Sequence, residues 1–147
     1  LLANQLQLTI ADIVDEAHDT HHPIASSLYY EDQKPEALSR SADFLESRVP
    51  KYLGYFERVL AGNGKGQTLV GARLSYPDLS LFQVVEGLKY AFPKAAAPLL
   101  RRHPKVRALA ERVAERPRIK AYLASQRRIP FNEHGIFRHY PELDGAA

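Results

Sequence analysis

Hydrophobic side chains recur every three to four residues from the start of the chain, which is the period of an amphipathic helix. A first helix is predicted over about residues 6–28, because its apolar positions keep that period: Leu6, Ile10, Ile13, Val14, Ala17, His21, Ile24 and Leu28. Acidic residues occupy a different face of the same helix. Pro23 interrupts the helix, and a kink is expected there because the apolar stripe continues beyond it.

A second long helix is predicted after a short polar connection over residues 31–35, with Pro35 near its first position. Its apolar positions keep the same period: Leu38, Ala42, Leu45, Val49, Leu53, Phe56 and Leu60. Pro50 predicts a second kink, and the glycine-rich segment 62–66 predicts the end of the helix. The short connection indicates that the two long helices run antiparallel.

The start of a third helix is marked by Ser75, whose hydroxyl is a good N-cap. Asp78 stands three residues later, where its carboxylate can reach back to the Ser75 N–H and complete a capping box. Leu74 and Leu79 are spaced to close a hydrophobic staple over the same turn. Pro77 falls in the first turn, where its missing N–H costs nothing. These four features are interpreted as structural, and Ser75 with Asp78 is not a catalytic pair.

The third helix is predicted to be the buried centre of the fold. Its apolar residues surround most of its circumference: Leu79, Leu81, Phe82, Val84, Val85, Leu88, Ala91 and Phe92. Pro93 and Pro98 are expected to break the chain after it, and shorter helices are predicted over residues 105–115 and 117–125. From Arg127 onward, an irregular tail is expected to pack back onto the helices. No strand pattern is present, so the fold class is all-α.

Length and composition support a single domain with its own core, because 147 residues with 45% hydrophobic content are typical of a globular chain. The absence of cysteine excludes disulfides and thiolate metal sites. No apolar run is long enough to cross a bilayer, and no signal peptide is evident. A chain that begins Leu1-Leu2 and contains no methionine is expected to be a fragment whose N-terminal part is missing.

The net charge is +3, and lysine and arginine are concentrated between Arg101 and Arg128. This run indicates either a phosphate-binding surface or the solvated face of two short helices, and the second interpretation is favoured. Aromatic residues are not interleaved as a base-stacking surface requires, so nucleic acid is not an expected partner.

Three segments in this order resemble the C-terminal helical domain of cytosolic glutathione transferases, nearest to the sigma- and pi-like group. They are IVDEAHD at residues 13–19, VGARLSYPDL at 70–79 and RPRIKAYLAS at 116–125. The resemblance implies that residues 1–147 form this domain, with two long kinked antiparallel helices around the buried, capped central helix. It also implies a missing N-terminal thioredoxin-like domain, which would bind glutathione and carry the activating Tyr or Ser.

The resemblance further implies a cytoplasmic homodimer that uses glutathione as a co-substrate and binds no permanent cofactor. The second substrate would be a small hydrophobic electrophile, attacked by the glutathione thiolate. No catalytic residue is expected in this chain, and the fragment alone is expected to be inactive. No membrane association is expected.

Several residues of the first helix acquire candidate roles from the resemblance. Asp19 falls where related enzymes place an acid that contacts the glutathione amine of the partner subunit, although a plain solvent-facing acid is the alternative. Tyr29 falls where a tyrosine faces the electrophile, with adjacent Tyr30 leaving the register open by one residue. Ala25 and Ser26 correspond to pocket positions, and their small size would widen the pocket.

His18 and His22 share a helix face at a spacing that metal ligands use. The remaining ligands of a site are not evident, so no metal is expected. Polar lining of the substrate pocket by His18 and His21 is the favoured functional interpretation.

Two other function classes remain open at this point. The same helical domain is appended to translation factors and aminoacyl-tRNA synthetases as a non-catalytic interaction module, and the basic run favours this alternative mildly. A free-standing nucleic-acid-binding domain has only the basic run in its favour. Asp19 together with Tyr29 favours the transferase.

Overall fold

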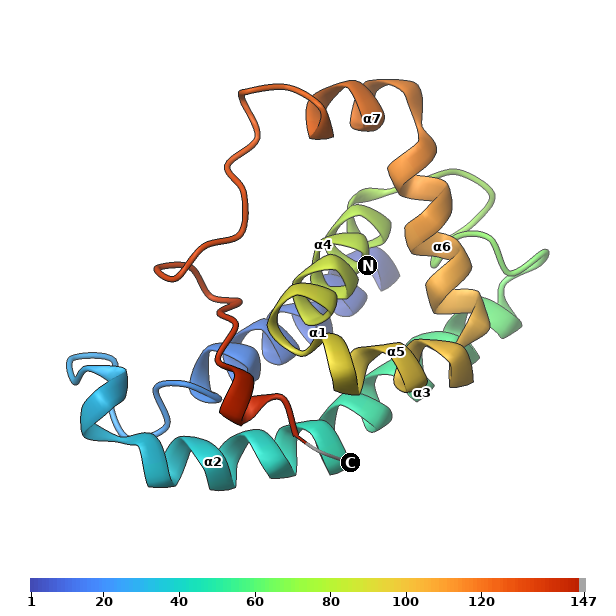
Figure 1. Ribbon diagram of the computed structural model, residues 1–147. Helices are drawn as coiled ribbons and strands as arrows, with labels where there is room; N and C mark the ends of the chain where they lie inside the picture. The colour runs from blue at the N-terminus through green and yellow to red at the C-terminus, as the bar shows by residue number, and fades with distance from the viewer. Residues whose placement is uncertain (146–147) are drawn as a thin grey trace.

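Helix α4 (Tyr76–Ala91) lies at the centre of the molecule (Figure 1). In the computed structural model, which describes residues 1–145, α1 (Leu2–Asp19) and α6 (Pro104–Glu115) are its main packing partners. Both faces of α4 are buried, as the sequence predicted from its nearly continuous apolar surface. The described residues contain helices and turns and no strand, so the all-α fold class is confirmed.

Helix α1 ends at Asp19, and the predicted continuation through a kink at Pro23 is wrong. Pro23 has no N–H to bond the carbonyl of residue 19, and its ring disfavours a helical conformation for the residue before it. The Thr20 hydroxyl donates to the Ala17 carbonyl (2.7 Å) and closes the helix end. Ile24 and Leu28, expected on the apolar helix face, are therefore exposed in the loop that follows.

The second long helix is continuous and consists of α2 (Lys34–Asp43), a π-helical turn (Phe44–Arg48) and α3 (Val49–Gly62). In the π-helical turn, the Val49 N–H donates to the carbonyl of Phe44, five residues earlier. This wider turn directly precedes Pro50, which lacks an N–H of its own. The helix runs antiparallel to α1 (Figure 1) and ends at Gly62, as predicted from the glycine-rich segment.

Helix α5 (Pro93–Arg102) occupies the segment where the sequence predicted a break. Pro93 stands at the first turn of this helix, where proline is tolerated. Pro98 lies inside the helix, but burial of the neighbouring apolar side chains outweighs the one hydrogen bond that it removes: Ala95, Ala96, Leu99 and Leu100. The side chain of Asp144, which is about 50 residues away in the sequence, accepts hydrogen bonds from the backbone N–H groups of Lys94 (2.8 Å) and Ala95 (3.1 Å). Asp144 thus caps the start of α5.

Helix α7 (Pro117–Leu123) is followed by the C-terminal tail, defined here as residues 124–145. The tail crosses from α7 to the far end of α1 and then reaches α2 and α5 (Figure 1). A 3-10 turn (Pro141–Leu143) lies near its end. The ring of Phe137 is buried against Gly87 of α4, so the predicted return of the tail onto the bundle is confirmed.

The start of α4 is held by the buried carboxylate of Asp78. It accepts a hydrogen bond from the Ser75 N–H (2.8 Å), and the Ser75 side chain accepts from the Asp78 N–H, so the predicted capping box is present. The Ser75 hydroxyl also donates to the same carboxylate oxygen (3.3 Å). The second carboxylate oxygen accepts from the Leu69 N–H (2.8 Å), a contact that the sequence did not predict. Leu74 packs against the core while Leu79 is exposed, so the staple between these two remains a prediction.

Replacing Asp78 with alanine is expected to destabilise the fold by about 2–4 kcal/mol, because two backbone N–H groups lose their buried acceptor. Ser75→Ala keeps the carboxylate and is the matched control, with an expected loss of about 1 kcal/mol. Urea unfolding followed by far-UV circular dichroism measures both. Equal losses in the two variants would contradict the central role of Asp78.

Gly87→Ala is expected to destabilise the fold by about 1–3 kcal/mol, since the added methyl group has to displace a packed ring. A Cβ on Gly87 would lie 2.5 Å from ring atoms of Phe137. Gly62→Ala is the control, because a Cβ there meets nothing within 4 Å. Faster proteolysis of the tail in Gly87→Ala than in Gly62→Ala is the second readout. Tail cleavage at the wild-type rate in both would count against the contact.

Candidate functional site

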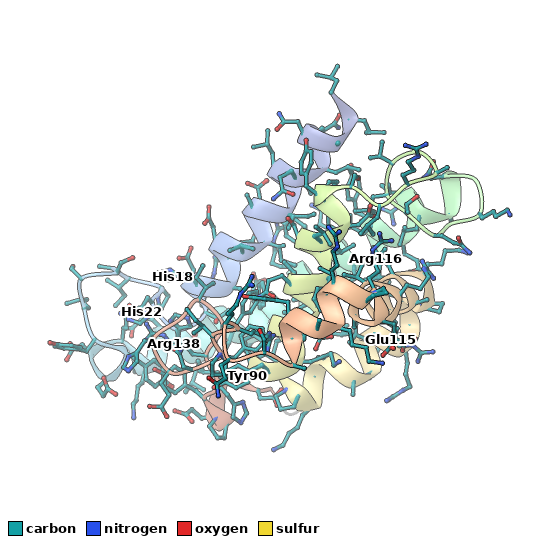
Figure 2. All side chains as sticks on the ribbon, turned by 90° about the horizontal axis from the view of Figure 1, so that it is seen from above. His18, His22, Tyr90, Glu115, Arg116 and Arg138 are labelled. Carbon is teal, nitrogen blue, oxygen red and sulfur yellow. The ribbon has the colours of Figure 1, made fainter. Side chains whose placement is uncertain are left out.

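The end of α1, the loop over residues 20–29 and the C-terminal tail meet at one end of the molecule. Figure 2 shows His18, His22 and Arg138 near one another at this end, with Glu115 and Arg116 at the α6–α7 side. Two of the predicted site residues, His18 and Asp19, end α1, and the other four lie on the loop: His21, Ala25, Ser26 and Tyr29. The tail lies beside these residues in space, although it is about 100 residues away from them in the sequence.

Three histidine rings form a cluster at the end of α1. The ring centroids of His18 and His22 are 5.4 Å apart in a stacked arrangement, and His21 meets both rings edge-on at 5.2 Å and 4.8 Å. The Nε2 atom of His21 lies 2.7 Å from the carbonyl oxygen of Ile136, and its Nδ1 faces Nδ1 of His22. Because a carbonyl only accepts, Nε2 of His21 carries a proton, and Nδ1 of neutral His21 accepts from His22.

Burial is the main cause that lowers the pKa of His21, to about 4. The hydrogen bond to Ile136 acts to raise this pKa, whereas the charges of Arg138, His22 and His18 act to lower it. The pKa of His22 is lowered for the same first reason, with Arg138 and His18 adding to the effect. His21 is only 1% exposed, so it lies beneath the tail and fixes it in place. The sequence predicts that His21 lines the substrate pocket, but the structure buries its ring beneath the tail.

Asp19 is the last residue of α1, and its side chain is 47% exposed. Its carboxylate lies 3.2 Å from Nδ1 of His18 and 4.0 Å from the guanidinium of Arg40. Neither neighbour encloses it, so a carboxylate oxygen remains open to a ligand that approaches from solvent.

The loop carrying Ala25, Ser26 and Tyr29 is fixed by the side chain of Gln33, which is completely buried. The Gln33 carbonyl oxygen accepts from the Ile24 N–H (2.8 Å), and its amide group donates to the Ala25 carbonyl (3.1 Å). This contact was not predictable from the sequence, because glutamine is usually an exposed residue. The loop is thus held by side-chain hydrogen bonds, although it belongs to no helix.

Tyr29 and Tyr30 have opposite environments. Tyr29 is 78% exposed, whereas Tyr30 is 4% exposed, stacks on Tyr140 (3.8 Å between ring centroids) and donates its hydroxyl hydrogen bond to Glu142 (2.7 Å). Desolvation and the hydrogen bond to Glu142 raise the pKa of the Tyr30 hydroxyl. Of the two, only Tyr29 presents a hydroxyl that an incoming ligand can reach.

A groove runs beside this end of the molecule, between α1, α4 and the tail. Its two hollows have volumes of about 280 Å³ and 310 Å³ and share Val14 and Gln83. One is closed by aromatic and small residues of the tail, including Phe131 and Gly135. The residues predicted from the sequence do not line these two hollows, and the tail residues that do were not among the candidates.

Within residues 1–145, no group of three histidine, cysteine or acidic side chains is arranged to hold a metal ion. Over the same residues, no helix has both the length and the apolar character that a membrane span needs.

Comparison with known proteins decides the family. The sequence profile described as "Glutathione S-transferase, C-terminal domain" matches residues 18–126, which is most of the chain. The chain belongs to this family. The match includes the end of α1, the loop, the capped start of α4 and helix α7, so the resemblance seen in the sequence is confirmed.

Individual relatives carry the same name. The chain is 28% identical to glutathione S-transferase 2 of Onchocerca volvulus over 138 residues, covering 90% of this chain and 61% of the relative. It is 33% identical to glutathione S-transferase P 1 of Bufo bufo over 90 residues, or 59% of this chain and 41% of the relative. A glutathione S-transferase of Plasmodium yoelii yoelii is 31% identical over 84 residues, covering 57% of this chain and 38% of the relative.

The chain therefore spans less than two thirds of the length of these transferases. These comparisons do not favour the alternative of an interaction module from translation factors or aminoacyl-tRNA synthetases.

The buried histidine predicts how the stability of this transferase domain depends on pH. The native pKa of His21 lies below that of a free histidine, so between about pH 6.5 and 4 the unfolded chain binds a proton that the folded chain does not. The free energy of unfolding is therefore expected to fall as the pH falls through this range. The difference between 6.5 and about 4 corresponds to roughly 3 kcal/mol.

Urea unfolding at several pH values measures the slope. His21→Gln is expected to flatten the slope relative to wild type, whereas His134→Gln, at an exposed position of the tail, is expected to keep it. Parallel curves for wild type and His21→Gln would contradict the assignment.

Proposed function

We propose that this chain forms the helical half of a dimeric, cytoplasmic glutathione transferase that joins glutathione to a small hydrophobic electrophile. The family match over residues 18–126 carries the proposal. Glutathione binding and thiol activation are assigned to a thioredoxin-like domain with an activating Tyr or Ser, as the family resemblance implies, and the support is that this chain covers 61% or less of the transferases compared above. The proposed enzyme uses glutathione as a substrate and needs no permanent cofactor.

In this proposal, the loop over residues 20–29 and the end of α1 form one wall of the electrophile pocket. Ala25 and Ser26 are small, so they leave room for a bulky substrate at this wall, and His18 adds a polar ring to it. Tyr29 contributes an exposed hydroxyl that can donate a hydrogen bond to charge developing on the electrophile. His21 and Gln33 act as positioning residues, because they hold the tail and the loop that build the wall.

Asp19 is proposed to bind the ammonium group of glutathione held by the partner subunit. The support is its exposed carboxylate at the end of α1, whose ion-pair partners among residues 1–145 are His18 and Arg40. An ammonium group is a matching charge-assisted partner for such a carboxylate.

The proposed reaction forms a bond between the glutathione sulfur and the electrophilic carbon. With an aryl chloride as the electrophile, the carbon–chlorine bond breaks, chloride leaves, and the thiol proton passes to solvent through the activating hydroxyl. This chain's own contribution is binding and orientation, which lower the barrier by holding the two reactants together.

The test is an assay of the polypeptide that contains residues 1–147 together with its glutathione-binding domain, using glutathione and an activated aryl chloride. Asp19→Asn is expected to raise the KM for glutathione by about 10-fold or more, because one charge-assisted hydrogen bond is lost. The kcat is expected to change less. Asp43→Asn, at an exposed acid on α2 without an ion pair among the described residues, is the control and is expected to keep the wild-type KM.

A wild-type KM in Asp19→Asn would overturn the cross-subunit role. Absence of glutathione-dependent turnover in the wild-type polypeptide, across aryl chlorides, enones and peroxides, would overturn the transferase proposal itself.

A further inference from the structure

The basic run over residues 101–128 is divided over two sides of α6. One side borders a hollow between α4, α7 and the tail, and there the cations have acidic partners. The carboxylate of Glu111 lies 3.6 Å from Nε of Arg107, and that of Glu115 lies 2.7 Å from Nζ of Lys120. The charge on this side is therefore largely balanced within the helices themselves.

The other side of α6 carries cations without such partners. Arg112 and Arg116 are four positions apart, and Lys105 lies two helical turns before Arg112, so all three leave the helix on the same side. Within residues 1–145, no carboxylate lies within 4 Å of the charged nitrogen atoms of any of them. All three side chains are exposed, so this side of α6 presents a line of uncompensated positive charge.

Arg112 and Arg116 also line a cleft between α6 and the loop that precedes α4. The cleft has a volume of about 190 Å³, and the rest of its lining consists of Gln67, Thr68, Ala72, Leu74, Leu109 and Val113. Leu109 and Val113 belong to the buried core, so the floor of the cleft is apolar while two guanidinium groups stand at its edge.

The guanidinium of Arg112 is already held in place at the cleft. Its Nη2 donates a hydrogen bond to the carbonyl oxygen of Gln67 (2.8 Å). The loop is itself fixed by Asn63, whose Nδ2 donates to the carbonyl oxygens of Thr68 and Gly71 (2.8 Å each). Since a guanidinium has five N–H donors, this one bond orients Arg112 and leaves donors for a ligand.

The cleft and the groove between α1 and α3 lie on different sides of α3. Tyr52 contacts α1 through its hydroxyl, which donates to Glu16, whereas the carboxylate of Glu57 accepts from the Val106 N–H of α6 (3.0 Å). Tyr52 and Glu57 are five positions apart, which separates them by about 140° around the helix. The loop between α3 and α4 also lies on the other side of α6 from the tail (Figure 1). A second subunit on the α1–α3 face, or a further domain on the side of the tail, would therefore leave the cleft open.

We propose that the cleft between α6 and the loop preceding α4 binds a phosphate group, either free or carried on a phosphorylated side chain. Two guanidinium groups one helical turn apart match the charge of a phosphate dianion, and each planar group can bind two of its oxygens. The cleft is smaller than the roughly 300 Å³ at which pockets for drug-sized molecules begin, so it suits the phosphate group and a few attached atoms. The inference does not rest on the proposed transferase function.

The test is a nuclear magnetic resonance titration of the isotope-labelled chain with three probes in about 150 mM salt, where long-range charge attraction is screened. The probes are inorganic phosphate, a five-residue peptide with phosphoserine between glycines, and the same peptide with serine. At least one phosphate probe is expected to bind about 10-fold or more tighter than the serine peptide. The shifts are expected to centre on the Nε–H signals of Arg112 and Arg116 and on the backbone of Gln67 and Thr68. Tighter binding of the phosphopeptide would identify a phosphorylated side chain as the source, and equal or tighter binding of inorganic phosphate would identify the free anion.

Phosphate probes that bind no more tightly than the serine peptide, or shifts centred elsewhere, would overturn the inference. The double variant Arg112→Gln/Arg116→Gln is expected to weaken the tighter phosphate probe about 10-fold or more. Arg102→Gln/Arg127→Gln removes the same charge from exposed positions outside the cleft and is expected to stay within about 2-fold of wild type. Equal weakening in the two double variants would show non-specific charge attraction instead of a site.

A single variant guards against an effect on the fold. Arg116→Gln leaves the hydrogen bond from Arg112 to the loop in place, and it is expected to weaken the phosphate probe about 3-fold or more. Circular dichroism checks that all variants are folded. Wild-type affinity in folded Arg116→Gln would count against the paired arginines as the site.

Discussion

The buried carboxylate of Asp78 is the interaction on which the arrangement of the helices depends. It fixes the first turn of α4 through Ser75 and the preceding loop through Leu69, so the central helix has one defined start. A buried charge that lost these N–H partners would carry a large desolvation cost, which makes alternative registers of α4 unfavourable. Since α1 and α6 both pack on α4, their positions follow from that register.

The C-terminal tail then makes contacts that link several helices and the loop to one another, in addition to the packing of the helices themselves. It lies against α4 through Phe137, receives the hydrogen bond of His21 at Ile136, stacks on Tyr30 through Tyr140 and caps α5 through Asp144. The tail contributes aromatic rings, a carbonyl and a carboxylate to these contacts, and none of these tail groups belongs to an α-helix. The wall proposed for the electrophile pocket is therefore built by tail contacts as much as by α1.

The two sides of α1 have different surroundings. One side carries Val14 and the hollows shared with α4 and the tail, while the other carries Glu16 and Thr9 beside Arg48 and Tyr52 of the second long helix. A single helix of eighteen residues thus borders two separate grooves.

The sequence by itself determined the all-α class, the capped start of α4, the long second helix and its end at Gly62, because these depend on hydrophobic period, capping residues and glycine, which act within a few positions. It also carried the family, through motifs on α1, α4 and α7. The hydrophobic period together with the prolines predicted too long a first helix and a break where α5 lies. Both errors arise because the effect of a proline depends on what the surrounding fold can bury or cap.

Only the tertiary structure decided that His21 is buried while Tyr29 is exposed, and that Gln33 and Asp144 serve distant backbone groups. It also brought Arg48 and Tyr52 of the second long helix against Glu16 of α1. Such contacts join residues far apart in the chain, and their free energy comes from burial and hydrogen-bond partners that exist only after the helices have packed.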